Sequence, residues 1–99
     1  MKKVKILFAS GMTDAKAKKI LDEVKANLKN KDICDAELKY VNVLANSDVS
    51  EAEKDCDFAI FAGQNVKTNL KVVNGRNSVY PFLGTDEVYN DIKKMVEEL

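Results

Sequence analysis

The chain has 99 residues, of which 45% are hydrophobic and 32% charged, and sixteen basic residues balance sixteen acidic ones. This composition is typical of a single globular domain, residues 1–99, and its zero net charge gives no general attraction to nucleic acid or to an anionic membrane. The apolar runs are about five residues long, far short of the ~20 that span a bilayer, so we expect a cytoplasmic protein with no membrane insertion and no nucleic-acid partner.

The first predicted strand is the nearly continuous apolar run at residues 4–9, which ends at the pair Ser10-Gly11. A short run of this kind, bounded by glycine, is typical of a strand buried on both faces, as in a parallel sheet. An amphipathic helix follows, which Thr13 or Asp14 can cap by accepting a backbone N–H. Its apolar face is formed by Ala17, Ile20, Leu21, Val24 and Leu28.

The middle of the chain holds two further predicted strands. From Cys34 to Tyr40, apolar residues alternate with charged ones, which predicts a strand at a sheet edge with one wet face. Ser50 and Glu53 have the spacing of a capping box and indicate the start of a short helix or turn. The run FAIFAG, residues 58–63, is apolar throughout and predicts a second central strand.

The last third of the chain predicts one short strand and one helix. Leu70, Val72 and Val73 indicate the strand, which the turn signal Asn74-Gly75 ends. Residues 79–83 (VYPFL) extend that strand or form an irregular connection, since Pro81 cannot donate to a strand ladder. After Gly84-Thr85, a helical apolar stripe runs through Val88, Ile92, Met95, Val96 and Leu99.

Strands that alternate with helices imply a parallel sheet with right-handed crossovers. We predict a three-layer, flavodoxin-like α/β fold, with four parallel strands in the order 2-1-3-4 and helices on both faces. Ligands of such sheets bind at the carboxyl ends of the strands. The segments expected at that edge are residues 10–14, 63–68 and 75–78.

Several kinds of chemistry are excluded by residues that the chain lacks. Without histidine, it has neither the commonest general base nor the commonest metal ligand. Cys34 and Cys56 could form one bridge, but their spacing matches no metal or redox motif, so we expect plain thiols in or near the core, no metal site and no cofactor. The sequence also contains no Walker loop and no dinucleotide fingerprint. A phosphate-accepting receiver domain would need acids where Ala9-Ser10 and Ala62-Gly63 stand.

Five segments of the chain resemble one protein family over essentially its whole length. They are KILFASGMT for an opening strand and loop, AKKILDEVKANL for a first helix, CDFAIFAG for a third strand, and KVVNG with YPFLGTDEVYNDIKKMVEE for the closing strand and helix. These segments resemble the IIB component of bacterial sugar phosphotransferase systems. The galactitol-type branch is the nearest, and the lactose-cellobiose type is also similar.

The resemblance implies a phosphocarrier that takes a phosphoryl group from a IIA protein and passes it to sugar bound by the membrane IIC component. In that family the acceptor is a cysteine thiolate at a helix N-terminus, where the dipole and the loop N–H groups lower its pKa and hold the phosphate. The matching position here is Ser10 when the chains are aligned through KIL, and Ala9 when they are aligned through GMT. The resemblance therefore makes Ser10 the candidate acceptor and Gly11, Met12, Thr13 and Asp14 the candidate phosphate-binding residues.

The missing cysteine leaves three hypotheses open. A serine hydroxyl is a much weaker nucleophile than a thiolate and needs an adjacent base, while the only nearby carboxylate, Asp14, is placed to cap a helix. The chain is a IIB-like protein whose active site has degenerated, a carrier in which serine replaced cysteine, or an unrelated α/β domain that binds an anion or a protein without transfer. The opposite rim of the site would be formed by residues 63–65, with Arg76 within reach of an anion.

Overall fold

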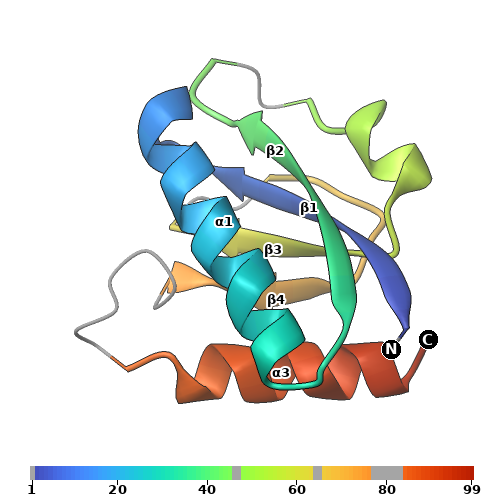
Figure 1. The fold of residues 1–99 in the computed structure, drawn as a ribbon. Coiled ribbons are helices and arrows are strands. Elements are labelled where there is room, and N and C mark those ends of the chain that lie inside the picture. Colours follow the sequence, from blue (N-terminus) through green and yellow to red (C-terminus); the bar gives the residue numbers. More distant parts are fainter. Residues whose placement is uncertain (1, 46–47, 64–65, 77–83) are drawn as a thin grey trace.

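The structure, a computed structural model, describes residues 2–45, 48–63, 66–76 and 84–99. Its centre is one sheet of four parallel strands in the order β2-β1-β3-β4, which confirms the predicted topology (Figure 1). The strands are β1 (Lys3–Ser10), β2 (Asp35–Asn42), β3 (Phe58–Ala62) and β4 (Val72–Asn74).

Two α-helices and one 3-10 turn accompany the sheet in the described residues: α1 (Asp14–Asn30), η1 (Ala52–Asp55) and α3 (Asp86–Glu97). Both α-helices pack on the same face, where their apolar stripes meet Ile6 and Phe8 of β1. The opposite face carries Leu7 and Ala9, which η1 and the connection at residues 66–70 cover. The two faces are therefore covered unequally: long helices lie on one, and a single 3-10 turn with irregular chain lies on the other.

The chain crosses between strands with a constant hand. From β1 to β2 it moves toward one edge of the sheet and passes over the α1 face. From β2 to β3, and again from β3 to β4, it moves toward the other edge and passes over the η1 face. The later crossovers differ from the first in both their direction across the sheet and the face that they cover, so all of them have the same handedness. Parallel β-crossover-β units require this uniform hand.

The ends of α1 are fixed by local hydrogen bonds. Thr13 is its N-cap, and the hydroxyl accepts from the Lys16 N–H at 3.5 Å, as the sequence predicted. At the other end, Asp32 has a φ of 56°, and the Ile33 N–H donates to the Leu28 carbonyl at 3.0 Å. This is a Schellman ending with aspartate where glycine is usual, so the sequence carried no glycine signal for it.

Two details of the sequence prediction are wrong, and residues 64–65 and 77–78 of the expected edge segments lie outside the described residues. Ser50 does not cap η1: Glu51 takes that position without a side-chain cap, and the Glu53 carboxylate bonds to residues 68 and 69 instead. Leu99, assigned to the apolar stripe of the last helix, lies beyond α3 and is 47% exposed. The segment at residues 79–83 falls among residues that the structure does not describe.

Glu53 joins the two crossovers on the η1 face. Its carboxylate accepts from the Thr68 hydroxyl and from the Asn69 backbone N–H, the latter at 2.9 Å. The side chain is 9% exposed, and these hydrogen bonds hold the pKa of its carboxyl below the usual value of 4.5. A charged side chain therefore connects the two crossovers through hydrogen bonds.

Replacing Glu53 with Gln is expected to lower the urea midpoint of unfolding at neutral pH. Because folding lowers the Glu53 pKa, its stabilisation is present above pH 4.5 and is lost as the pH falls through the folded-state value. The deficit of Glu53→Gln relative to wild type should therefore shrink on acidification, when unfolding is followed by circular dichroism. Glu51→Gln makes the same charge change at an exposed neighbour, which forms an ion pair with the exposed Lys54. An equal deficit in both variants, or one independent of pH, would contradict this assignment.

Candidate functional site

Ser10 ends the central strand β1 and lies directly before the loop that leads into α1. Its partners across the ladders are Asn42 of β2 and Ala62 of β3, so it stands at the carboxyl edge of the sheet as predicted. The residue is nevertheless only 1% exposed. A phosphoryl donor has no open path to a side chain buried to this degree.

The Ser10 hydroxyl belongs to a closed ring of hydrogen bonds. The Tyr40 hydroxyl has one proton, and its shortest bond, 2.7 Å, goes to the Met12 carbonyl. Ser10 Oγ, 3.0 Å from Tyr40 Oη, must then be the donor of that pair. Ser10 Oγ in turn accepts from the Met12 N–H at 3.4 Å, which returns the ring to the residue where it began. The proton and a lone pair of Ser10 are both engaged, and the ring contains no base.

Asn42 holds the same loop from the end of β2. Its amide Nδ2 donates to the Met12 carbonyl at 3.1 Å, and its Oδ1 accepts from the Leu44 N–H at 3.0 Å. The Met12 carbonyl therefore receives two side-chain donors from one strand. As a result, the end of β2 fixes the backbone of the loop.

The four loop residues proposed to hold phosphate differ in what they offer. Met12 is half-buried and uses its N–H on Ser10 Oγ, and the Thr13 hydroxyl accepts from Lys16 as the helix cap. Gly11 lies against Leu44, whose Cδ1 would be 2.9 Å from a Cβ at that position. Asp14 is exposed in the first turn of α1, where its negative charge favours the positive end of the helix dipole and repels an incoming phosphate.

The opposite rim is only partly described. Gly63 ends β3 with a φ of 91°, a conformation that side chains other than glycine rarely adopt; residues 64 and 65 lie outside the described part. Arg76 is exposed and lines a pocket of about 220 Å³ together with Asn74 of β4 and with Glu87 and Asp91 of α3. The geometry therefore groups Arg76 with acidic side chains of α3.

The two thiols cannot take over the role of the missing nucleophile. Cys34 is buried beside β2 and Cys56 is half-buried after η1, and both are free. Burial raises the pKa of the Cys34 thiol, and the Asp35 carboxylate adds to the rise. Burial also raises the pKa of Cys56, against a smaller opposing effect of Lys39. Both sulfurs are therefore kept as protonated, weakly nucleophilic thiols.

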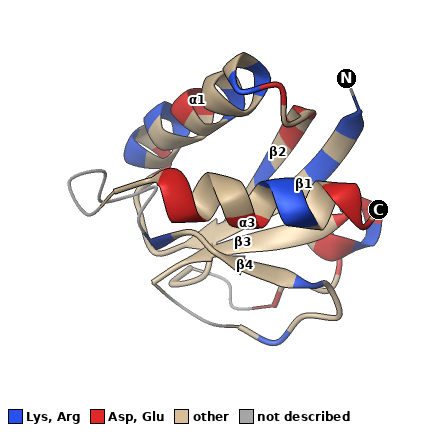
Figure 2. Ribbon diagram, turned by 90° about the horizontal axis from the view of Figure 1, so that it is seen from below, with Lys and Arg blue, Asp and Glu red and all other residues tan. Residues whose placement is uncertain are grey.

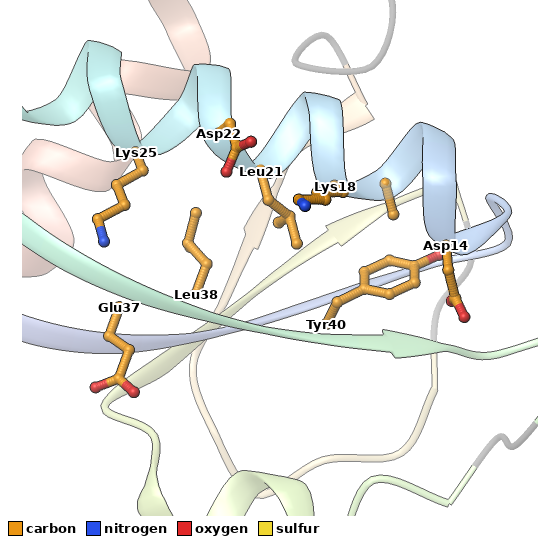
Figure 3. Close-up of a pocket in the computed structure, with 9 residues that line it drawn as sticks. Asp14, Lys18, Leu21, Asp22, Lys25, Glu37, Leu38 and Tyr40 are labelled. Atoms are coloured by element: carbon orange, nitrogen blue, oxygen red, sulfur yellow. The ribbon is translucent and has the colours of Figure 1, made fainter.

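An open groove of about 400 Å³ lies between α1 and β2 (Figure 3). Leu21, Leu38 and Tyr40 form its apolar floor, and charged side chains of α1 stand along its side. In Figure 2, basic and acidic residues both occur along α1 and β2, the charged positions of β1 are basic, and β3 is uncharged. In the described ranges, no group of three or more His, Cys, Asp or Glu side chains could hold a metal, and no helix is long and apolar enough to cross a bilayer.

Sequence reasoning placed Ser10 and its loop correctly but missed the residues that control them. Tyr40 fitted the apolar side of an alternating strand, and nothing in that pattern showed that its hydroxyl reaches a loop 28 residues earlier in the chain. Asn42 and Leu44 carried no signal either. The only hint was an aromatic residue with a polar tip, which usually finds a partner when it is buried.

Comparisons of the chain with protein-family models, with curated proteins and with solved structures found no significant match. The family resemblance of the sequence gains no support from them. The function has to be argued from the chemistry of the side chains.

The hydrogen-bond ring predicts a stability effect for Tyr40→Phe. Removing the phenol hydroxyl leaves the Met12 carbonyl with one donor fewer and Ser10 without its acceptor, which should cost about 1 kcal/mol of unfolding free energy. Urea unfolding of Tyr40→Phe, Ser10→Ala and the double variant forms a cycle. The double variant should lose less than the two single losses combined, because both single changes break the same contact. Strict additivity would show that the two hydroxyls do not interact.

Proposed function

We propose that this chain is a non-catalytic α/β binding domain that docks a protein partner at the carboxyl edge of its sheet. The observation that carries the proposal is the burial of Ser10, whose hydroxyl is hydrogen-bonded to Tyr40 of β2 and to the Met12 N–H of the following loop. The resemblance to IIB components suggests the partner: a IIA phosphocarrier, with the membrane IIC component as the next in the series. In this proposal, docking takes place and phosphoryl transfer does not.

Three chemical arguments support binding without transfer. Transfer to a serine needs an exposed oxygen and a base that accepts its proton, while Ser10 donates that proton to a tyrosine hydroxyl. The thiols offer no alternative acceptor, since burial raises the pKa of each. A phosphate ester on serine would also be more stable than one on cysteine and less suited to onward transfer.

A protein partner is favoured over a free anion by what is exposed at this edge. Asp14 places a negative charge at the start of α1, where an anion would otherwise gain from the helix dipole. Leu44 is 70% exposed and lies against Gly11, so an apolar side chain stands in water beside the rigid loop. An exposed leucine next to ordered backbone suits burial by another protein.

A second candidate, a phosphocarrier that uses Ser10 itself, is favoured by one observation. Ser10 lies at the carboxyl end of the central strand and directly before a helix N-terminus, which is the position that phosphoryl chemistry requires in this kind of sheet. In this case the ring around Ser10 would have to open when the partner binds.

Phosphoryl transfer separates the two candidates. Wild type, Ser10→Ala and Ser10→Cys would be incubated with labelled phosphoenolpyruvate, the general transfer proteins and a panel of IIA proteins. We expect no label on wild type or Ser10→Ala, because the only hydroxyl in question is buried. Label on wild type that Ser10→Ala abolishes would overturn the proposal in favour of the carrier, and acid and alkali stability would identify the linkage. Label on Ser10→Cys alone would indicate retained docking at a site that has lost its nucleophile.

Docking is tested directly by titrating the ¹⁵N-labelled chain with the same IIA proteins and following amide chemical shifts. The largest shifts are expected at residues 10–14 and at Leu44. Leu44→Asp should weaken binding about tenfold, as loss of an apolar anchor does. Leu99→Asp is the matched control, because Leu99 is also an exposed leucine but lies beyond the end of α3. Absence of binding by every IIA protein, or equal affinities of the two variants, would argue against this docking surface.

A further inference from the structure

We propose that two copies of this chain associate through their β2 strands, antiparallel about a two-fold axis at Leu38, and join their sheets into one. This inference concerns the β2 edge of the sheet and the groove beside it, and it does not depend on the proposed docking at the loop.

The edge of β2 has unused backbone groups at regular positions. Among the described residues, β2 pairs with β1 alone. The N–H groups of Asp35 and Val43 donate to β1, at Lys2 and Ser10, so the odd-numbered residues of the strand turn toward β1. The even-numbered residues therefore direct their N–H and C=O groups to the free edge. Those residues are Ala36, Leu38 and Tyr40 within the strand, followed by Asn42 at its end.

An antiparallel pair of β2 strands centred on Leu38 would hydrogen-bond the free N–H and C=O groups of Ala36, Leu38 and Tyr40 in both copies. Leu38 then faces Leu38 of the second copy, and Ala36 faces Tyr40, in both directions. Each of these is a hydrogen-bonded pair of an antiparallel ladder, because both members point their backbone groups across the edge. Because the even-numbered residues already direct their backbone groups to the free edge, this pairing requires no change in the backbone conformation of β2.

The same register places opposite charges across the axis. Glu37 of each copy lies opposite Lys39 of the other, in the non-hydrogen-bonded pairs where side chains approach most closely. Both residues are exposed, and Glu37 forms a 4.0 Å ion pair with the exposed Lys5. An edge charged with one sign, or with an irregular order of signs, would resist such pairing. This edge complements itself.

The groove beside β2 extends this complementarity to α1. Because the axis runs perpendicular to the sheet, both copies of α1 lie on the same side and run antiparallel to one another. The charges that α1 contributes to the groove follow the order Asp14, Lys18, Asp22, Lys25, which alternates from negative to positive (Figure 3). The second copy of α1 runs in the opposite direction, so it presents the same four charges in reverse order. Each acidic residue of one helix then lies opposite a basic residue of the other. The partly exposed Leu21 and Leu38 line the same groove and would be covered by the second copy.

The test is a charge swap on the wild-type chain and its variants, with mass measured by sedimentation from about 1 µM to 1 mM. Wild type is expected to approach twice the 11.0 kDa mass of one chain as concentration rises. Glu37→Lys or Lys39→Glu alone turns both cross-strand pairs into like charges and should raise the dissociation constant roughly tenfold or more. An equimolar mixture of the two single variants, and the double variant, restore opposite charges and should associate again.

Two controls keep the result specific. Glu97→Lys and Lys93→Glu make the same changes of net charge at exposed positions of α3 and should leave association unchanged. Amide hydrogen exchange should slow with concentration at Ala36, Leu38 and Tyr40, while the odd-numbered residues of β2 are protected at every concentration. A chain that stays monomeric throughout overturns the proposal. So does a dimer that is insensitive to the charge swap, or one without protection at those three amides.

Discussion

The fold depends on β1, which pairs with β2 on one side and with β3 on the other and is buried on both faces. Ile6, Leu7 and Phe8 are fully buried because side chains of β1 alternate between two separate apolar clusters. Every other element packs against this strand or against its neighbours. The position of Ser10 follows from the same constraint, since the residue that ends the central strand is enclosed by the elements on either side of it.

Ser10 has the position of a reactive residue, but its burial and hydrogen bonds keep it from reacting. A parallel sheet brings the end of its central strand to the edge where ligands bind, and the helix that follows begins there. Ser10 occupies this position, but Tyr40 and Met12 use its hydrogen-bonding capacity to close the loop on itself. The same contacts that would orient a reactive side chain hold this one in place as a structural link between β1 and β2.

The charges of the chain are arranged locally even though they cancel in total. The β3 strand carries none, while α1 and β2 carry charges of both signs (Figure 2). One largely buried charge, Glu53, connects two crossovers on the η1 face. The edge at β2 and the loop edge at Leu44 are thus different surfaces, so the proposed association of two copies and the proposed docking of a partner would not compete for the same residues.

The sequence by itself determined the elements of the fold and their order. Continuous apolar runs located β1 and β3, period-two alternation located β2, and stripes of helical period located α1 and most of α3, because all of these patterns depend on neighbours a few residues apart. The parallel order 2-1-3-4 follows from their alternation. Only the tertiary structure decided the state of Ser10, because Tyr40 is thirty residues away in the chain and meets it through strand register. The same holds for Glu53, whose local spacing with Ser50 suggested a cap, while its actual partners, Thr68 and Asn69, come from another crossover. Spacing along the chain predicts backbone geometry, whereas side-chain chemistry depends on which distant residues the packing brings together.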